Sequence, residues 1–154
     1  MLKINKKVEY ALMALKYIAD SDQSRLISAR EICDEFHTPF DTTAKVMQVM
    51  NNHGILKSVK GIKGGYSLLR PLKEISYMEL VQMIEGKDEL GKACFSVKGK
   101  CELFEKCNIV SPVEQLNQKL NMYLMTLSLE ELLNGTKFTT PPTKFIQELN
   151  SWVQ

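Results

Sequence analysis

The sequence lacks the features that mark membrane proteins and secreted proteins. None of its apolar runs approaches the roughly 20 residues that a helix needs to cross a bilayer. The first residues, Met1-Leu2-Lys3, do not open a signal peptide. We therefore expect a cytoplasmic protein without a membrane partner. In that compartment disulfides are rare, and clustered cysteines more often serve metal or redox chemistry.

The motifs of common enzymes are also missing. The glycine-rich segment at residues 60–65 contains no Gly-Lys-Ser or Gly-Lys-Thr, which excludes a P-loop. The two histidines, His37 and His53, lie far in sequence from the cysteines of the second half, and no nucleophile–base motif is present. A zinc-dependent or thiol-based enzyme is therefore poorly supported, and we expect a protein that is not an enzyme.

Acidic residues are scarce in one part of the chain. Residues 1–71 hold 11 Lys and Arg against 7 Asp and Glu, whereas residues 72–154 hold 9 against 11. No acidic residue occurs from Lys57 to Arg70. A locally basic segment in a near-neutral chain indicates a surface for an anionic polymer. The alternative to such a binding surface is a basic hairpin that contacts only water, and the neighbouring elements decide between the two.

The first half of the chain has the element order of a winged helix-turn-helix domain. Apolar residues at spacings of three and four predict a helix over residues 4–20. A capping box, Ser28-Ala-Arg-Glu31, predicts the start of a second helix, and a third is expected from residues 39–40 to residue 52. Two strand-like segments, 55–59 and 66–70, flank a turn with three glycines, which predicts a β-hairpin wing.

The third helix and the basic wing predict a double-stranded DNA partner. The polar face of such a helix reads the major groove, and lysines of a wing meet phosphates or enter the minor groove. We expect DNA contacts from the start of the second helix, from the third helix and from the wing. The expected contact residues are Ser28, Arg30, Thr42, Thr43, Lys45, Gln48, Lys57, Lys60, Lys63, Gly64 and Tyr66.

The second half predicts a dimer. Capping motifs start short helices at Ser76 and Ser128, and Ser111 followed by Pro112 predicts the start of a long helix. Apolar residues then recur at alternating spacings of three and four, an a/d seam formed by Val113, Leu116, Leu120, Tyr123 and Leu127. The seam could pack on its own domain, but too few other helices remain to cover it, so we expect a homodimer. This reading gives four parts: a DNA-binding domain (1–86), a cysteine-rich loop (87–110), a dimerisation helix (111–134) and a tail (135–154).

Three of the four cysteines lie within fourteen residues, at Cys94, Cys101 and Cys107. Surrounding lysines favour the thiolate form, which binds metal, and such thiolates hold iron–sulfur clusters. Zinc is less well supported, because cysteine pairs separated by two to four residues are missing. Spacing alone leaves open three free thiols, or a disulfide with one spare cysteine. Cys33 falls on the core face of the second helix, where we expect a structural role.

These motifs together resemble the bacterial family of iron–sulfur winged-helix regulators that includes IscR and NsrR. The likeness is carried by Glu9-Tyr-Ala-Leu12 in the first helix, by Ser28-Ala-Arg-Glu-Ile32, and by the glycine-rich wing Leu56-Lys-Ser-Val-Lys-Gly-Ile-Lys-Gly-Gly-Tyr66. It covers residues 1–134 and includes the three cysteines and the dimer helix in the same order. Two features depart from it: six residues separate the first two cysteines where five are common, and Val110 stands where IscR-like members have histidine.

The resemblance implies a mainly α fold with a small wing and a cluster-dependent transcription regulator. It implies Cys94, Cys101 and Cys107 as cluster ligands and Glu9 of the other subunit as the fourth, as in NsrR-like members. Three cysteines and a carboxylate favour a 4Fe–4S cluster over 2Fe–2S. The signal would be nitric oxide, iron supply or redox state. The alternative is a metal-free winged-helix regulator that senses oxidants through a disulfide among the three thiols.

Overall fold

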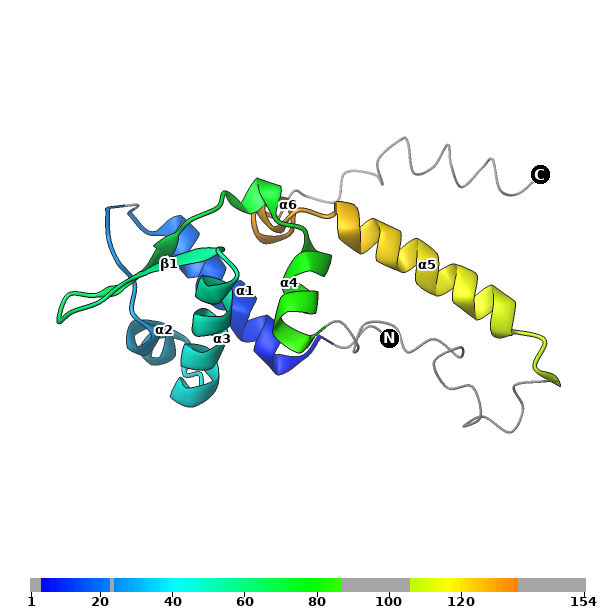
Figure 1. Ribbon diagram of the computed structural model, residues 1–154, viewed down its shortest axis with the longest axis horizontal. Helices are drawn as coiled ribbons and strands as arrows, with labels where there is room; N and C mark the ends of the chain where they lie inside the picture. Colours follow the sequence, from blue (N-terminus) through cyan, green and yellow to red (C-terminus); the bar gives the residue numbers. More distant parts are fainter. Residues whose placement is uncertain (1–3, 23, 87–105, 136–154) are drawn as a thin grey trace.

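The elements of the chain follow the predicted order of a winged helix-turn-helix domain with a long additional helix (Figure 1). The structure, a computed structural model, describes residues 4–22, 24–86 and 106–135. Its elements are α1 (Lys6–Asp20), α2 (Ala29–Phe36), α3 (Phe40–Asn52), β1 (Leu56–Val59), β2 (Gly65–Leu68), the 3-10 helix η1 (Leu72–Glu74), α4 (Tyr77–Glu85), α5 (Val110–Thr126) and α6 (Leu129–Leu133). The predicted fold class, mainly α with a β-hairpin wing, is confirmed.

Serine side chains start three of the helices, as the capping motifs predicted. The Oγ atoms of Ser28, Ser76 and Ser128 each accept a hydrogen bond from the backbone N–H three residues later, at 3.1 Å. The carboxylate of Glu31 is used for a tertiary contact: its Oε1 accepts from the Tyr17 hydroxyl at 3.0 Å and from Arg25 at 2.6 Å. The same local signal therefore begins α2 and ties it to the end of α1.

The predicted start of the long helix, with Ser111 as its N-cap and Pro112 as its first residue, is wrong by two residues. Helix α5 begins at Val110, and its N-cap Ile109 makes no side-chain capping bond. The backbone N–H of Val113 already donates to the Ile109 carbonyl at 3.0 Å, so the helical pattern closes before Ser111 can act as a cap. Pro112 falls within the first turn, where its missing N–H leaves no helical bond unmade.

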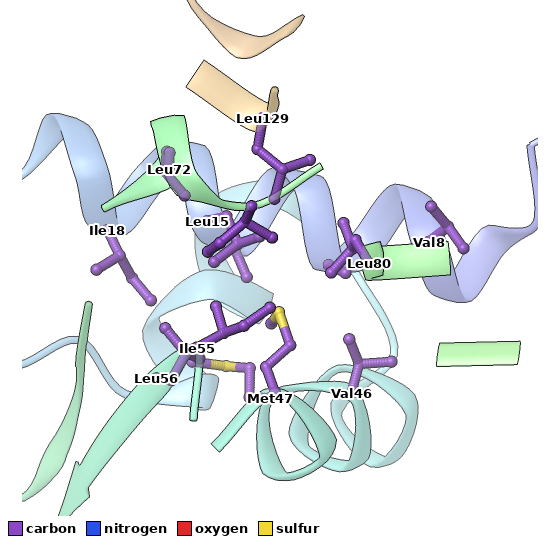
Figure 2. Close-up of a cluster of buried hydrophobic side chains, with 14 of the residues drawn as sticks. Val8, Leu15, Ile18, Val46, Met47, Ile55, Leu56, Leu72, Leu80 and Leu129 are labelled. Atoms are coloured by element: carbon purple, nitrogen blue, oxygen red, sulfur yellow. The ribbon is translucent and has the colours of Figure 1, made fainter. Parts of the chain in front are cut away.

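The hydrophobic core is built around α1 (Figure 2). The buried face of α1, which includes Val8, Leu15 and Ile18, packs against α3, α4 and β2. Met47 and Leu80, from α3 and α4, are fully buried there. Cys33 is also buried, which confirms its predicted core position. This packing holds α3 with one face inward and leaves its opposite face at the surface.

The chain after α5 returns to the same core. The Tyr77 N–H donates to the Leu127 carbonyl and the Leu129 N–H donates to the Ile75 carbonyl, both at 2.8 Å. Leu129 is completely buried, and burial of a leucine side chain stabilises a fold by about 1.5–3 kcal/mol. The C-terminal end of α5 is thus anchored, while its N-terminal end extends away from the domain (Figure 1). None of the helices in the described ranges is long and apolar enough to cross a membrane.

Candidate nucleic-acid interface and cluster ligands

Helix α3 presents a polar face at the surface next to the wing. Its buried residues are Thr43, Val46, Met47 and Met50. Lys45 and Gln48 are exposed on the opposite side, and Thr42 is half-buried. Thr43 is completely buried, and its hydroxyl bonds to the hydroxyl of Thr38 at 2.9 Å. The prediction that Thr43 contacts DNA is therefore wrong, since this side chain is part of the domain interior.

A groove runs between α3 and the wing and collects predicted DNA contacts from both. Its volume is about 610 Å³. Lys45 and Gln48 line it from α3, Tyr66 lines it from β2, and Lys60 lines it from the turn of the wing. The sequence reasoning missed its other lining residues, which are Asp41, Ala44, Asn51, Asn52 and Ser58. Asp41 could have been found, because it lies four residues before Lys45 and shares its helix face.

The wing is fixed to the domain at its base. Strands β1 and β2 are antiparallel, with Leu56 opposite Leu68 and Val59 opposite Gly65. The N–H of Tyr66 donates to the Ile27 carbonyl at 2.8 Å, and the Ile27 N–H donates back at 3.0 Å. A Cβ atom added at Gly65 would lie 2.9 Å from the Ile27 carbonyl oxygen, so this close approach requires glycine. Exposed lysines then follow along the hairpin at Lys57, Lys60 and Lys63.

The first turn of α2 holds two of the predicted DNA contacts, and one of them, Arg30, lies beside the start of α3. The Ser28 oxygen accepts the capping bond of α2, and a serine hydroxyl can donate a hydrogen bond as well. The guanidinium of Arg30 stacks over the ring of Phe40, 4.8 Å from the ring centroid. Such a cation–π contact holds a cation in place without neutralising it. Arg30 is thus positioned as an exposed positive charge next to the first residue of α3.

The predicted cluster ligands are partly described. Cys94 and Cys101 lie outside the described residues. Cys107 is a free, half-buried thiol three residues before α5. Glu9 is in the first turn of α1, where its Oε2 atom lies 2.5 Å from Nζ of Lys6 and raises the pKa of that lysine by hydrogen bonding and charge. Among the residues described, no three His, Cys, Asp or Glu side chains are grouped closely enough to hold a metal ion.

Cys107 and Glu9 do not meet within one chain. Figure 1 shows the N-terminal end of α5, which Cys107 precedes, well away from α1. The donor chemistry of the two residues nevertheless suits an iron–sulfur cluster, because thiolate sulfur and carboxylate oxygen both bind iron. The Lys6 side chain is 75% exposed, whereas the Glu9 side chain is 35% exposed and its Oε2 atom is buried. An ion pair with one solvent-exposed partner is weak, so Lys6 does not commit the Glu9 carboxylate to this contact.

A model of the Rrf2 family, described as iron-dependent transcriptional regulators, matches residues 4–135. The chain belongs to the Rrf2 family. The expected resemblance to IscR- and NsrR-like regulators is thereby confirmed. The Rrf2 relatives with assigned roles are transcriptional regulators, a class of proteins that are not enzymes.

Individual relatives of this Rrf2 chain match along most of their length. A candidate HTH-type transcriptional regulator of Aquifex aeolicus is 29% identical over 129 residues, which cover 82% of this chain and 88% of that protein. The transcriptional regulator NsrR of Shouchella clausii is 25% identical over 126 residues, covering 82% of this chain and 83% of its own.

Solved structures share the fold of the Rrf2 chain. CymR of B. subtilis, a global cysteine regulator, aligns with a TM-score of 0.63 at 21% identity, over 89% of this chain and 100% of its own. IscR of T. potens aligns with a TM-score of 0.63 at 18% identity, over 94% of this chain and 96% of its own. At these identities the likeness establishes the winged-helix fold alone.

Asn51 joins helix α3 of this Rrf2 chain to its wing. Its Oδ1 atom accepts a hydrogen bond from the Ser58 N–H at 2.9 Å, which connects the last turn of α3 to the middle of β1. No sequence signal pointed to it, because the bond depends on how the hairpin folds back. Asn51 thus links the two sides of the groove by a side-chain hydrogen bond.

We expect Asn51→Ala to loosen the wing without unfolding the domain. The loss of one such hydrogen bond costs about 0.5–1.5 kcal/mol, which corresponds to up to roughly tenfold weaker DNA binding if the wing must be held in place. Hydrogen exchange at the Ser58 amide and fluorescence anisotropy with labelled duplex DNA measure the two effects. The neighbouring exposed residue gives the control: Asn52→Ala should leave Ser58 exchange unchanged. Equal exchange at Ser58 in both variants would contradict this role of Asn51.

Proposed function

We propose that this chain is a homodimeric cytoplasmic transcription regulator whose operator binding is controlled by an iron–sulfur cluster. The groove between α3 and the wing is the observation that supports operator binding most directly. It brings Lys45 and Gln48 of the helix together with Lys60 of the wing. Lys60 belongs to the segment from Lys57 to Arg70, which contains no acidic residue. In this proposal α3 enters the major groove and the wing lies against the phosphates or in the minor groove.

The exposed apolar face of α5 supports the homodimer. Leu116 and Leu120 of the predicted seam are 57% and 42% exposed in the single chain, whereas Leu127 packs against the domain core. Exposed leucines in a row on one helix face mark an interaction surface. A two-fold dimer would place two α3 helices against half-sites roughly 34–36 Å apart, or a multiple of that distance.

The proposed ligands of the cluster are Cys94, Cys101 and Cys107 of one subunit and Glu9 of the other. This donor set favours 4Fe–4S over 2Fe–2S. A bound cluster would supply an iron site that reacts with nitric oxide or oxidants and that is lost when iron is scarce. The role of the protein is to hold four donors from two subunits. Since α1 packs directly on α3, a ligand on α1 would connect the cluster site to the helix that enters the major groove.

Anaerobic purification tests the proposal. The expected product is a brown protein that contains iron and sulfide and binds duplex DNA selected from a random library, with an affinity that changes when a chelator removes the iron. A colourless protein whose thiols titrate, and whose DNA binding changes on oxidation, would instead support the metal-free disulfide regulator. A protein that selects no DNA sequence with or without iron would contradict both.

A further inference from the structure

Ile62 is a fully exposed apolar side chain at the tip of the wing. Its relative exposure is 108%, whereas the next most exposed large apolar residue in the described ranges, Met122, reaches 60%. Turns at hairpin tips usually carry Gly, Asn, Asp, Ser or Pro, each for a conformational or hydrogen-bonding reason. A β-branched isoleucine has no such reason, so the turn itself does not explain this residue.

The backbone of the turn holds Ile62 outward. The N–H of Gly64 donates to the Gly61 carbonyl at 2.9 Å, which makes Ile62 and Lys63 the two central residues of a β-turn. Gly61 has a φ of +121°, a conformation that favours glycine. A Cβ atom at Gly64 would lie 2.3 Å from the Val59 carbonyl oxygen. The two glycines therefore permit a tight turn that places Ile62 away from the rest of the domain.

The charges around Ile62 identify the kind of partner. Lys60 and Lys63 flank it in sequence, Lys57 lies on the same hairpin, and no acidic residue occurs between Lys57 and Arg70. The wing tip and the groove beside α3 form one surface, because Lys60 belongs to the wing and also lines the groove. A membrane or protein partner at the wing tip would not explain why the two are joined. One double-stranded DNA can contact the whole of this surface, with α3 in the major groove and the wing tip in the adjacent minor groove.

We infer that Ile62 enters the DNA minor groove as an apolar contact that selects the base step beneath the wing. The inference rests on the proposed DNA-binding function and adds a determinant of specificity to it. The flanking lysines would contact phosphates, which carry no sequence information. The isoleucine side chain would meet the floor of the groove, where the guanine N2 amino group marks G·C pairs and its absence leaves room at A·T pairs. Apolar side chains in this position also favour base steps that unstack easily.

The experiment uses duplexes that the full-length protein selects from a random library. Wild type should enrich A·T pairs at the positions flanking the α3 half-site, and Ile62→Ala should select the same half-site with this flanking preference lost. On a duplex selected by wild type, Ile62→Ala should bind roughly tenfold more weakly. The dependence of its affinity on salt should stay that of wild type, because no ionic contact is removed. Lys63→Ala should instead lower the salt slope by about one unit.

Replacing the flanking adenines by 2,6-diaminopurine adds an amino group in the minor groove and keeps the major-groove pattern of adenine. This change should weaken wild-type binding and leave Ile62→Ala unaffected. Val59→Ala, which removes another exposed apolar residue of the same hairpin, is the control and should behave as wild type does. If Ile62→Ala keeps wild-type affinity and flanking preference, Ile62 has no such role, although the proposed function stands. If wild type selects no DNA, the proposed function fails and this inference fails with it.

Discussion

Replacing Leu116 and Leu120 together by glutamate is expected to leave a folded monomer that binds its operator at least about 100-fold more weakly. Leu116 and Leu120 are 57% and 42% exposed in the single chain and belong to no buried cluster of the described residues, so the substitutions should cost the folded subunit little. In the dimer, each glutamate would place a charge in an apolar interface, where burial of an unpaired charge is strongly unfavourable. The loss of affinity follows from losing the second DNA-binding domain, since linking two binding units raises affinity by about 10²–10⁴.

Sedimentation equilibrium and gel shifts on full and half operators measure these effects. The same helix offers a matched control in Met122 and Met125, which are 60% and 56% exposed. At 100° per residue they lie off the face that carries the two leucines. Met122→Glu with Met125→Glu should therefore remain dimeric and bind the full operator. A dimeric leucine variant, or a monomeric methionine variant, would show that another surface of the chain forms the dimer.

The local signals of the sequence predicted the element order well. Helix caps at Ser28, Ser76 and Ser128 involve residues three apart, so the information that starts each helix lies next to it in the chain. The wing was predictable for a similar reason, because glycine is required at positions where the backbone approaches itself or turns sharply. These features depend little on how the elements pack together.

The errors concern contacts that depend on packing. Thr43 was placed on the polar face of α3 because of its hydroxyl, although it lies three, four and seven residues before Val46, Met47 and Met50, which are all buried. The spacing carried the correct signal, and a hydrogen bond to Thr38 satisfies the buried hydroxyl. The bond from Ser58 to Asn51 could not be read at all, since it exists only once the wing has folded against α3.

A second large effect is expected at the cysteines: Cys107→Ser should yield a folded dimer without iron. Serine oxygen is a poor replacement for a thiolate in an iron–sulfur cluster, and Cys107 lies in a free, half-buried state outside the core. Cys33→Ser is the control. This buried cysteine sits on the core face of α2, so serine there should lower the free energy of unfolding by on the order of 1–3 kcal/mol and keep the iron. Iron and sulfide analysis, with circular dichroism for folding, measures both variants. Loss of iron in Cys33→Ser alone would reverse the ligand assignment.

Mixed dimers show whether Glu9 acts across the dimer. Because Cys107 and Glu9 lie apart in one chain, we expect each site to take cysteines from one subunit and Glu9 from the other. A two-fold dimer has two equivalent sites. In a dimer of one Cys107→Ser chain and one Glu9→Ala chain, ligation between subunits leaves one site complete and the other without both ligands. Ligation within a subunit would leave neither site complete.

Co-expression with two different affinity tags isolates the mixed dimer. We expect it to hold, in one of its two sites, a cluster that is as stable to chelator as that of wild type. If its iron is as easily lost as that of the Glu9→Ala homodimer, the carboxylate is not supplied by the partner subunit.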